Sequence, residues 1–128
     1  LIQFGSFNLK YPILADYELN LRLFANNKIR LKYIDLTIAE FSESGLSSKS
    51  TDLQFFYDKP AIIQNIFENY LALPAYHHAL FIKGELEFKN WKILKGISTI
   101  ISWGRVTNRP FRSVYLILAM FKNRLLCI

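Results

Sequence analysis

The spacing of hydrophobic and polar positions changes along the chain, and the change separates two kinds of predicted structure. Residues 29–34 alternate apolar and basic side chains, the period-2 pattern of a half-buried strand, and residues 37–41 predict a second short strand. A helix is predicted to begin near Asp16, a residue type favoured at helix N-caps, and to end at Asn26-Asn27. The N-terminal part therefore predicts a small mixed α/β unit.

From about residue 52 onward the apolar positions follow a helical period instead. The first of these segments places its apolar residues on one face of an amphipathic helix: Ile62, Ile63, Ile66, Phe67, Tyr70 and Leu71. Pro74 favours the first turn of the next helix, which Gly84 is expected to interrupt. Two further helices are predicted over residues 87–103 and 111–126.

A serine-rich loop over residues 43–51 is the predicted internal boundary. We expect two regions, residues 1–50 and residues 51–128, so that the fold class is a mixed α/β fragment, mainly α, with a helical tail.

The apolar fraction of 52% and the charged fraction of 20% argue against disorder. The single cysteine, Cys127, excludes an intrachain disulfide. No apolar run approaches the ~18 residues that a membrane-spanning helix needs.

The basic residues are concentrated in the last third of the chain. Residues 1–82 contain seven Lys/Arg and eight Asp/Glu, a balance of −1, whereas residues 83–128 contain nine Lys/Arg and two Asp/Glu, a balance of +7. Such asymmetry indicates an anionic partner surface. No known nucleic-acid-reading motif is present, so membrane lipid headgroups are favoured over nucleic acid.

Aromatic residues are interleaved with these basic residues: Trp91, Trp103, Phe111, Tyr115 and Phe121 among Lys89, Lys92, Lys95, Arg105, Arg109, Arg112, Lys122 and Arg124. Basic side chains beside aromatic anchors are typical of a helix that lies at a membrane surface. The alternative is an amphipathic helix that packs on the protein core and leaves its basic side chains in solvent.

Asp16 is the candidate catalytic residue. On a helix, Asp16 and Glu18 point about 200° apart, so they do not form a paired acid and base. Glu18 lies four residues before Arg22, which is the favourable orientation for a helical ion pair. Asp16 is left alone at the helix start, where the helix dipole favours an ionised carboxylate that can accept a proton. The alternative role is a helix cap that contributes ~1 kcal/mol to stability.

His77 and His78 are adjacent, and adjacent side chains on a helix point ~100° apart, so these two would not chelate one ion. Neither has a Cys, Asp or Glu three or four residues further along. We interpret both as ordinary helix residues and expect no metal site in this chain.

Three segments follow one another in an order that is informative: Ala15-Asp16-Tyr17-Glu18-Leu19, then Tyr33-Ile34-Asp35, then Ser44-Gly45-Leu46-Ser47-Ser48. This order resembles the C-terminal part of the catalytic domain of family 2 glycosyltransferases, which are nucleotide-sugar-dependent enzymes with the GT-A fold. The resemblance covers roughly residues 1–50. Two positions depart from the family pattern, because Ala15 stands where Glu is common and Ser44 replaces a Gly.

The resemblance implies an inverting enzyme in which Asp16 is the general base toward an acceptor hydroxyl. It implies substrate contacts for Gly45, Ser47 and Ser48. The acceptor would be a saccharide or a lipid-linked glycan, as in bacterial surface-polysaccharide biosynthesis. A nucleotide-sugar donor and a divalent metal, Mn or Mg, are implied for the whole enzyme, with their sites upstream of this chain.

We therefore expect the chain alone to lack the N-terminal half of a catalytic domain, to be inactive, and to self-associate through uncovered apolar surface. The expected location is cytoplasmic, at the inner face of the cytoplasmic membrane. The competing hypothesis is a non-catalytic, basic helical module that binds a membrane surface or a protein partner.

Overall fold

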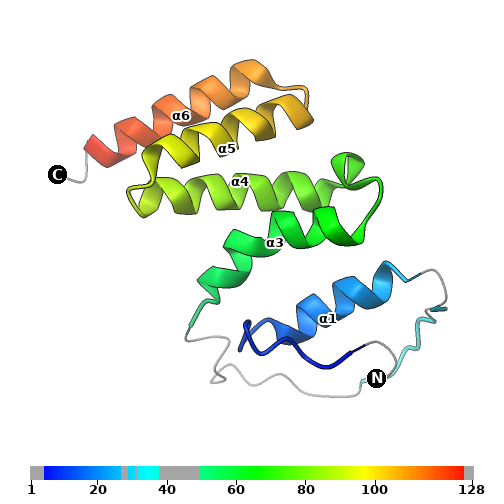
Figure 1. The fold of residues 1–128 in the computed structure, drawn as a ribbon. Coiled ribbons are helices and arrows are strands. Elements are labelled where there is room, and N and C mark those ends of the chain that lie inside the picture. Colours follow the sequence, from blue (N-terminus) through cyan, green and yellow to red (C-terminus); the bar gives the residue numbers. More distant parts are fainter. Residues whose placement is uncertain (1–4, 27–28, 31, 38–49, 126–128) are drawn as a thin grey trace. The chain divides into compact units, whose positions relative to one another are not determined.

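The computed structural model describes residues 5–26, 29–30, 32–37 and 50–125, and its regular structure in these ranges is helical (Figure 1). The elements are α1 (Ala15–Phe24), α3 (Leu53–Ile66), the 3₁₀ turn η2 (Tyr70–Ala72), α4 (Pro74–Lys89), α5 (Ile93–Val106) and α6 (Pro110–Leu125). The chain forms two compact units, Leu1–Phe55 and Phe56–Ile128.

The expected mixed α/β fold with GT-A strands is wrong, since the described residues contain helices and no strand. Residues 29–30 and 32–34, from the first predicted strand, are irregular, and the second, at 37–41, lies outside the described residues except for Thr37. The side chains of Tyr33, Ile34 and Leu36 are mostly exposed. An alternating pattern forms a strand only where a neighbouring strand accepts its backbone hydrogen bonds, and the described residues offer no such neighbour.

The first unit has a small core in which Tyr11, Leu19 and Phe55 are buried. The ring of Phe55 forms T-shaped pairs with the rings of Tyr11, at a centroid distance of 5.3 Å, and Tyr17, at 5.5 Å. Such T-shaped pairs contribute beyond the apolar area that they bury. The core therefore fixes the start of α1 against the first turn of α3.

The Asp52 side chain connects the start of α3 to the segment before α1 by hydrogen bonds. Its carboxylate precedes α3 and accepts the backbone N–H of Phe55 at 3.3 Å, which is the geometry of an N-cap. The same carboxylate accepts the backbone N–H of Ile13 at 3.5 Å. Asp52 is buried, so both hydrogen bonds form away from bulk water. In the sequence, an Asp directly before an apolar helical segment is an N-cap signal.

Asp52→Ala is expected to lower the free energy of unfolding by about 1–2 kcal/mol, because it removes an N-cap and leaves two backbone donors without their acceptor. Asp52→Asn keeps an acceptor oxygen and should lose less. Urea unfolding followed by circular dichroism measures both variants. Equal stability of Asp52→Ala and the parent would show that neither hydrogen bond matters.

The second unit has its own core, formed by Ile63, Tyr76, Ala79, Leu80 and Trp103. The predicted amphipathic face is confirmed at Ile63, which is fully buried, and at Phe67 and Tyr70, which pack against the core. Leu71 is exposed instead, because α3 ends at Ile66 and the chain continues into η2. The predicted apolar face is therefore confirmed as far as Tyr70 and wrong at Leu71.

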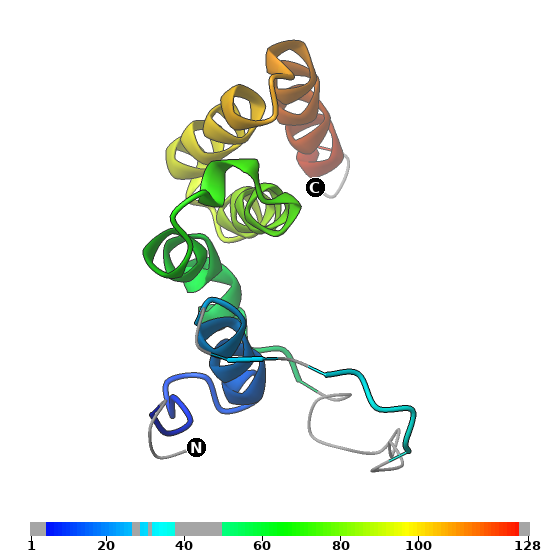
Figure 2. The same ribbon diagram turned by 90° about the vertical axis from the view of Figure 1, so that its right-hand side faces the viewer.

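Helices α4, α5 and α6 follow one another back and forth, and α5 packs against both of the others (Figures 1 and 2). Pro74 occupies the first turn of α4, as predicted. Gly84 does not interrupt α4, which continues to Lys89. The chain reverses at Trp91 instead, a residue with a positive φ of 60°.

The phenol of Tyr76 is expected to make the stability of this unit depend on pH in the alkaline range. Burial raises the pKa of the Tyr76 phenol above its ordinary value of 10.0, and Tyr70, whose ring lies 4.9 Å away, raises this pKa further. The folded protein therefore holds this proton more tightly than the unfolded chain does. The resulting contribution to stability is complete below about pH 10 and is lost as the pH rises through the folded pKa.

We expect urea unfolding between pH 9 and pH 11.5 to show a decline in stability that Tyr76→Phe makes shallower. Tyr115→Phe, at an exposed tyrosine, is the matched control. A decline of the same slope in the parent and in Tyr76→Phe would contradict the assignment.

Candidate functional site

Asp16 is the second residue of α1 and not its N-cap. The helix begins at Ala15, and Leu14 occupies the cap position without a side-chain hydrogen bond. The Asp16 carboxylate is exposed, and its Oδ1 accepts the backbone N–H of Tyr17 at 2.7 Å. The interpretation of Asp16 as an N-cap is therefore wrong, although the carboxylate still lies in the first turn, where the helix dipole favours negative charge.

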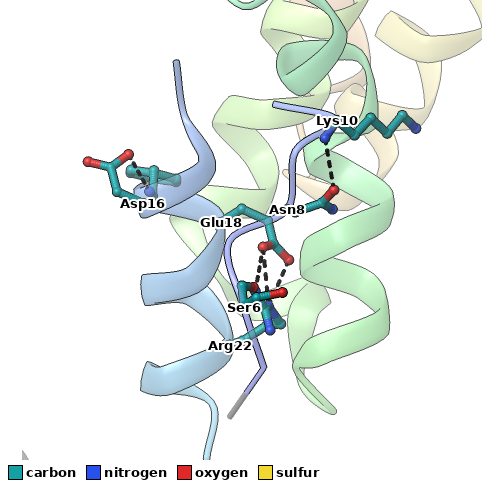
Figure 3. Close-up of polar contacts among 7 residues, drawn as sticks. Ser6, Asn8, Lys10, Asp16, Glu18 and Arg22 are labelled. Carbon is teal, nitrogen blue, oxygen red and sulfur yellow. Dashed lines mark hydrogen bonds and ion pairs between the residues drawn. The ribbon is translucent and has the colours of Figure 1, made fainter. Parts of the chain in front are cut away.

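Glu18 and Arg22 form the predicted ion pair on the other side of α1 (Figure 3). Arg22 Nε lies 3.0 Å from Oε1 of Glu18, and Arg22 Nη2 lies 2.9 Å from Oε2, a two-point contact. Arg22 Nη2 also donates to the Ser6 carbonyl at 2.9 Å. The pair therefore holds the segment before α1 onto the helix, and its role is structural.

Figure 3 shows that Asp16 points away from Glu18 and Arg22, as their helical spacing predicts. Within the described part of the chain, no side chain forms a hydrogen bond or an ion pair with the Asp16 carboxylate. An exposed carboxylate that is not neutralised by a cation can accept a proton from a hydroxyl brought within about 2.6–3.2 Å. The other predicted site residues, Gly45, Ser47 and Ser48, lie outside the described residues.

The two histidines have different surroundings. His77 Nε2 lies 2.7 Å from the Leu71 carbonyl oxygen and so connects α4 to η2. His78 is exposed. The residues described by the structure include no group of three His, Cys, Asp or Glu side chains that could hold a metal ion.

A hollow of about 250 Å³ opens in the second unit. Its lining comes from three helices and combines aromatic and aliphatic side chains with one imidazole and one guanidinium: His78 and Phe81 from α4, Trp103 from α5, and Arg112 and Leu116 from α6. The apolar lining suits an aromatic or aliphatic group, and the guanidinium suits an anionic group. No sequence spacing indicates this hollow, because its residues meet only when α4, α5 and α6 pack.

Some aromatic residues of the basic last third of the chain, residues 83–128, are buried and others are exposed. Trp103 is buried in the core, and Phe121 packs edge-on against Phe88 at 5.6 Å. Phe111 and Tyr115 are exposed. This region therefore contributes to the core of its unit and also presents apolar surface. That it lies at a membrane surface stays a prediction. None of the described helices is long and apolar enough to cross a membrane.

Comparison with known proteins finds relatives among mycobacterial proteins. The chain is 35% identical over 57 residues to a PGL/p-HBAD biosynthesis glycosyltransferase of Mycobacterium bovis (strain BCG) and, to the same degree, to one of Mycobacterium tuberculosis (strain H37Ra). The match covers 44% of this chain and 22% of each relative, so the chain spans about a fifth of their length. No family model matches the chain, and no solved structure matches it. The similarity supports a relationship to glycosyltransferases.

Proposed function

We propose that this chain is part of a nucleotide-sugar-dependent glycosyltransferase of the family 2 type, in which Asp16 is the general base. The observation that carries the proposal is the similarity to the mycobacterial glycosyltransferases. The position of Asp16 supports its role, because an exposed carboxylate outside the Glu18–Arg22 ion pair is available to a substrate.

The proposed reaction is a single displacement with inversion. The acceptor oxygen attacks the anomeric carbon of the donor sugar, and the bond from that carbon to the diphosphate oxygen breaks. The acceptor proton passes to a carboxylate oxygen of Asp16, and the nucleoside diphosphate leaves with the bonding electron pair. No residue of this chain is assigned to a metal, because the described residues contain no group of three His, Cys, Asp or Glu side chains that could hold one. None is assigned to the donor.

The acceptor is proposed to be a saccharide or a lipid-linked glycan. To test the proposal, the complete polypeptide encoded by the gene is incubated with radiolabelled uridine, guanosine and thymidine diphosphate sugars, Mg²⁺ or Mn²⁺, and lipid extract from the source cells. Transfer of label from at least one donor into the lipid or glycan fraction would support the function. A folded protein that transfers no sugar from any donor would instead favour the non-catalytic interaction module.

A further inference from the structure

One face of α6 carries large apolar side chains that the rest of the described structure leaves in solvent. We name it the α6 stripe, and it consists of Phe111, Val114, Tyr115 and Leu118. Their exposed fractions lie between 56% for Val114 and 89% for Phe111. Their spacing of three, one and three residues places the four side chains within about 100° of arc on a helix.

The α6 stripe is distinct from the face by which α6 packs on its own unit. That inward face includes Ser113, which is buried against Gly104, and Phe121, which packs on Phe88. Leu116 packs against the core cluster. Since α6 already has a buried face, the stripe is not needed for packing within this unit. A contiguous exposed apolar stripe of this kind marks an interaction surface.

The charges beside the stripe indicate what covers it. Helices α5 and α6 contain no Asp or Glu, and the whole segment from Ile93 to Ile128 has six Lys/Arg and no acidic residue. Arg112 and Lys122 are exposed, and neither forms a hydrogen bond or an ion pair within the described part of the chain. Lys122 follows Phe111 by eleven residues, so it continues the stripe on the same face of the helix.

We propose that the α6 stripe docks this protein onto a membrane surface that contains anionic lipids. In this arrangement α6 lies parallel to the surface, with Phe111, Val114 and Leu118 among the acyl chains and the Tyr115 hydroxyl at the headgroup level. Arg112 and Lys122 contact lipid phosphates. A second copy of the chain fits the stripe less well, because pairing two α6 helices would bring two surfaces of the same positive charge together.

The test uses vesicles of phosphatidylcholine alone or mixed equally with phosphatidylglycerol, sedimented with the full-length protein in the absence of any sugar donor. We expect binding to the mixed vesicles and little binding to phosphatidylcholine alone. The double variant Phe111→Ser/Leu118→Ser should lower the partition coefficient about tenfold or more, because two apolar anchors are lost. Arg112→Gln/Lys122→Gln should weaken binding and reduce its dependence on salt.

The matched control is Phe24→Ser/Leu9→Ser, which changes the same residue types at exposed positions elsewhere in the chain. Since all four side chains are exposed, each variant should keep the parent's circular dichroism spectrum and midpoint of thermal unfolding. Equal losses in the two double variants would overturn the proposal, as would equal binding to both kinds of vesicle. Concentration-dependent self-association that Phe111→Ser/Leu118→Ser abolishes, without vesicle binding by the parent, would assign the stripe to an interface between copies instead.

Discussion

Asp16→Asn is expected to lower the kcat of glycosyl transfer by about 100- to 10,000-fold, the range that a positioned general base contributes. The amide is nearly the same shape as the carboxylate and retains an oxygen that can accept the N–H of Tyr17, but it does not take up the acceptor proton. The fold should persist, because an exposed charge in the first turn of a helix contributes only about 0.3–1 kcal/mol.

The expected loss falls on kcat and not on the KM for the donor, since Asp16 acts on the acceptor oxygen during the chemical step. Glu68→Gln is the matched control, because Glu68 is likewise an exposed acid, lies outside the segments that resemble the family, and the substitution makes the same change in charge. Steady-state kinetics and thermal unfolding of both variants separate catalysis from stability. If Asp16→Asn retained the parent's kcat, Asp16 would be only a charged residue in the first turn of α1.

The second large effect concerns the crossing of α4 and α5. A Cβ on Gly96 would lie 2.6 Å from Cδ2 of Phe88 and 3.2 Å from the Gly84 carbonyl oxygen, and a Cβ on Gly84 would lie 2.5 Å from Cδ1 of Ile100. Phe88 and Ile100 are both buried, so neither side chain has free space into which to move. Any larger residue therefore forces the two helices apart.

We expect the double variant Gly84→Ala/Gly96→Ala to lose about 2–4 kcal/mol of stability. Overpacking costs about 1–3 kcal/mol at each site, and the better helix propensity of Ala recovers part of that cost. The midpoint of thermal unfolding should fall by about 10 °C or more. Because the two glycines face each other, the single variants are measured as well to obtain their coupling.

Ser98→Ala, at an exposed position of the same helix, is the control for helix propensity alone and should stabilise the protein slightly. If the double glycine variant were also more stable than the parent, α4 and α5 would not approach as closely as the structure indicates.

The close contact of α4 and α5 at Gly84 and Gly96 also shows why the sequence predicts the helices better than it predicts their packing. A 3.6-residue apolar period and Pro74 are local signals, and they predicted the helices from residue 52 onward. Gly84 was expected to interrupt a helix because its intrinsic propensity is low. That expectation omitted Gly96, whose distance from Gly84 is fixed only by tertiary packing. A glycine that allows close helix contact cannot be distinguished by local sequence from one that breaks a helix.

The strand prediction failed for a related reason. Residues 29–34 have a local alternating pattern, but a strand also requires a partner, and periodicity within one segment carries no information about that partner. At the candidate site, the Glu18–Arg22 pair was predictable because its four-residue spacing is local. The hollow lined by His78, Trp103 and Arg112 was not, since its residues come from three helices.

The most direct test of the account is the rate of nucleoside diphosphate release by the complete protein, with its preferred nucleotide sugar, in the presence and absence of acceptor. The parent and Glu68→Gln are predicted to release the diphosphate at similar rates that depend on the acceptor. Asp16→Asn is predicted to release it at least about 100 times more slowly. Equal acceptor-dependent rates in all three proteins would contradict the assignment of the base, and the absence of acceptor-dependent release from the parent would contradict the proposed glycosyl transfer itself.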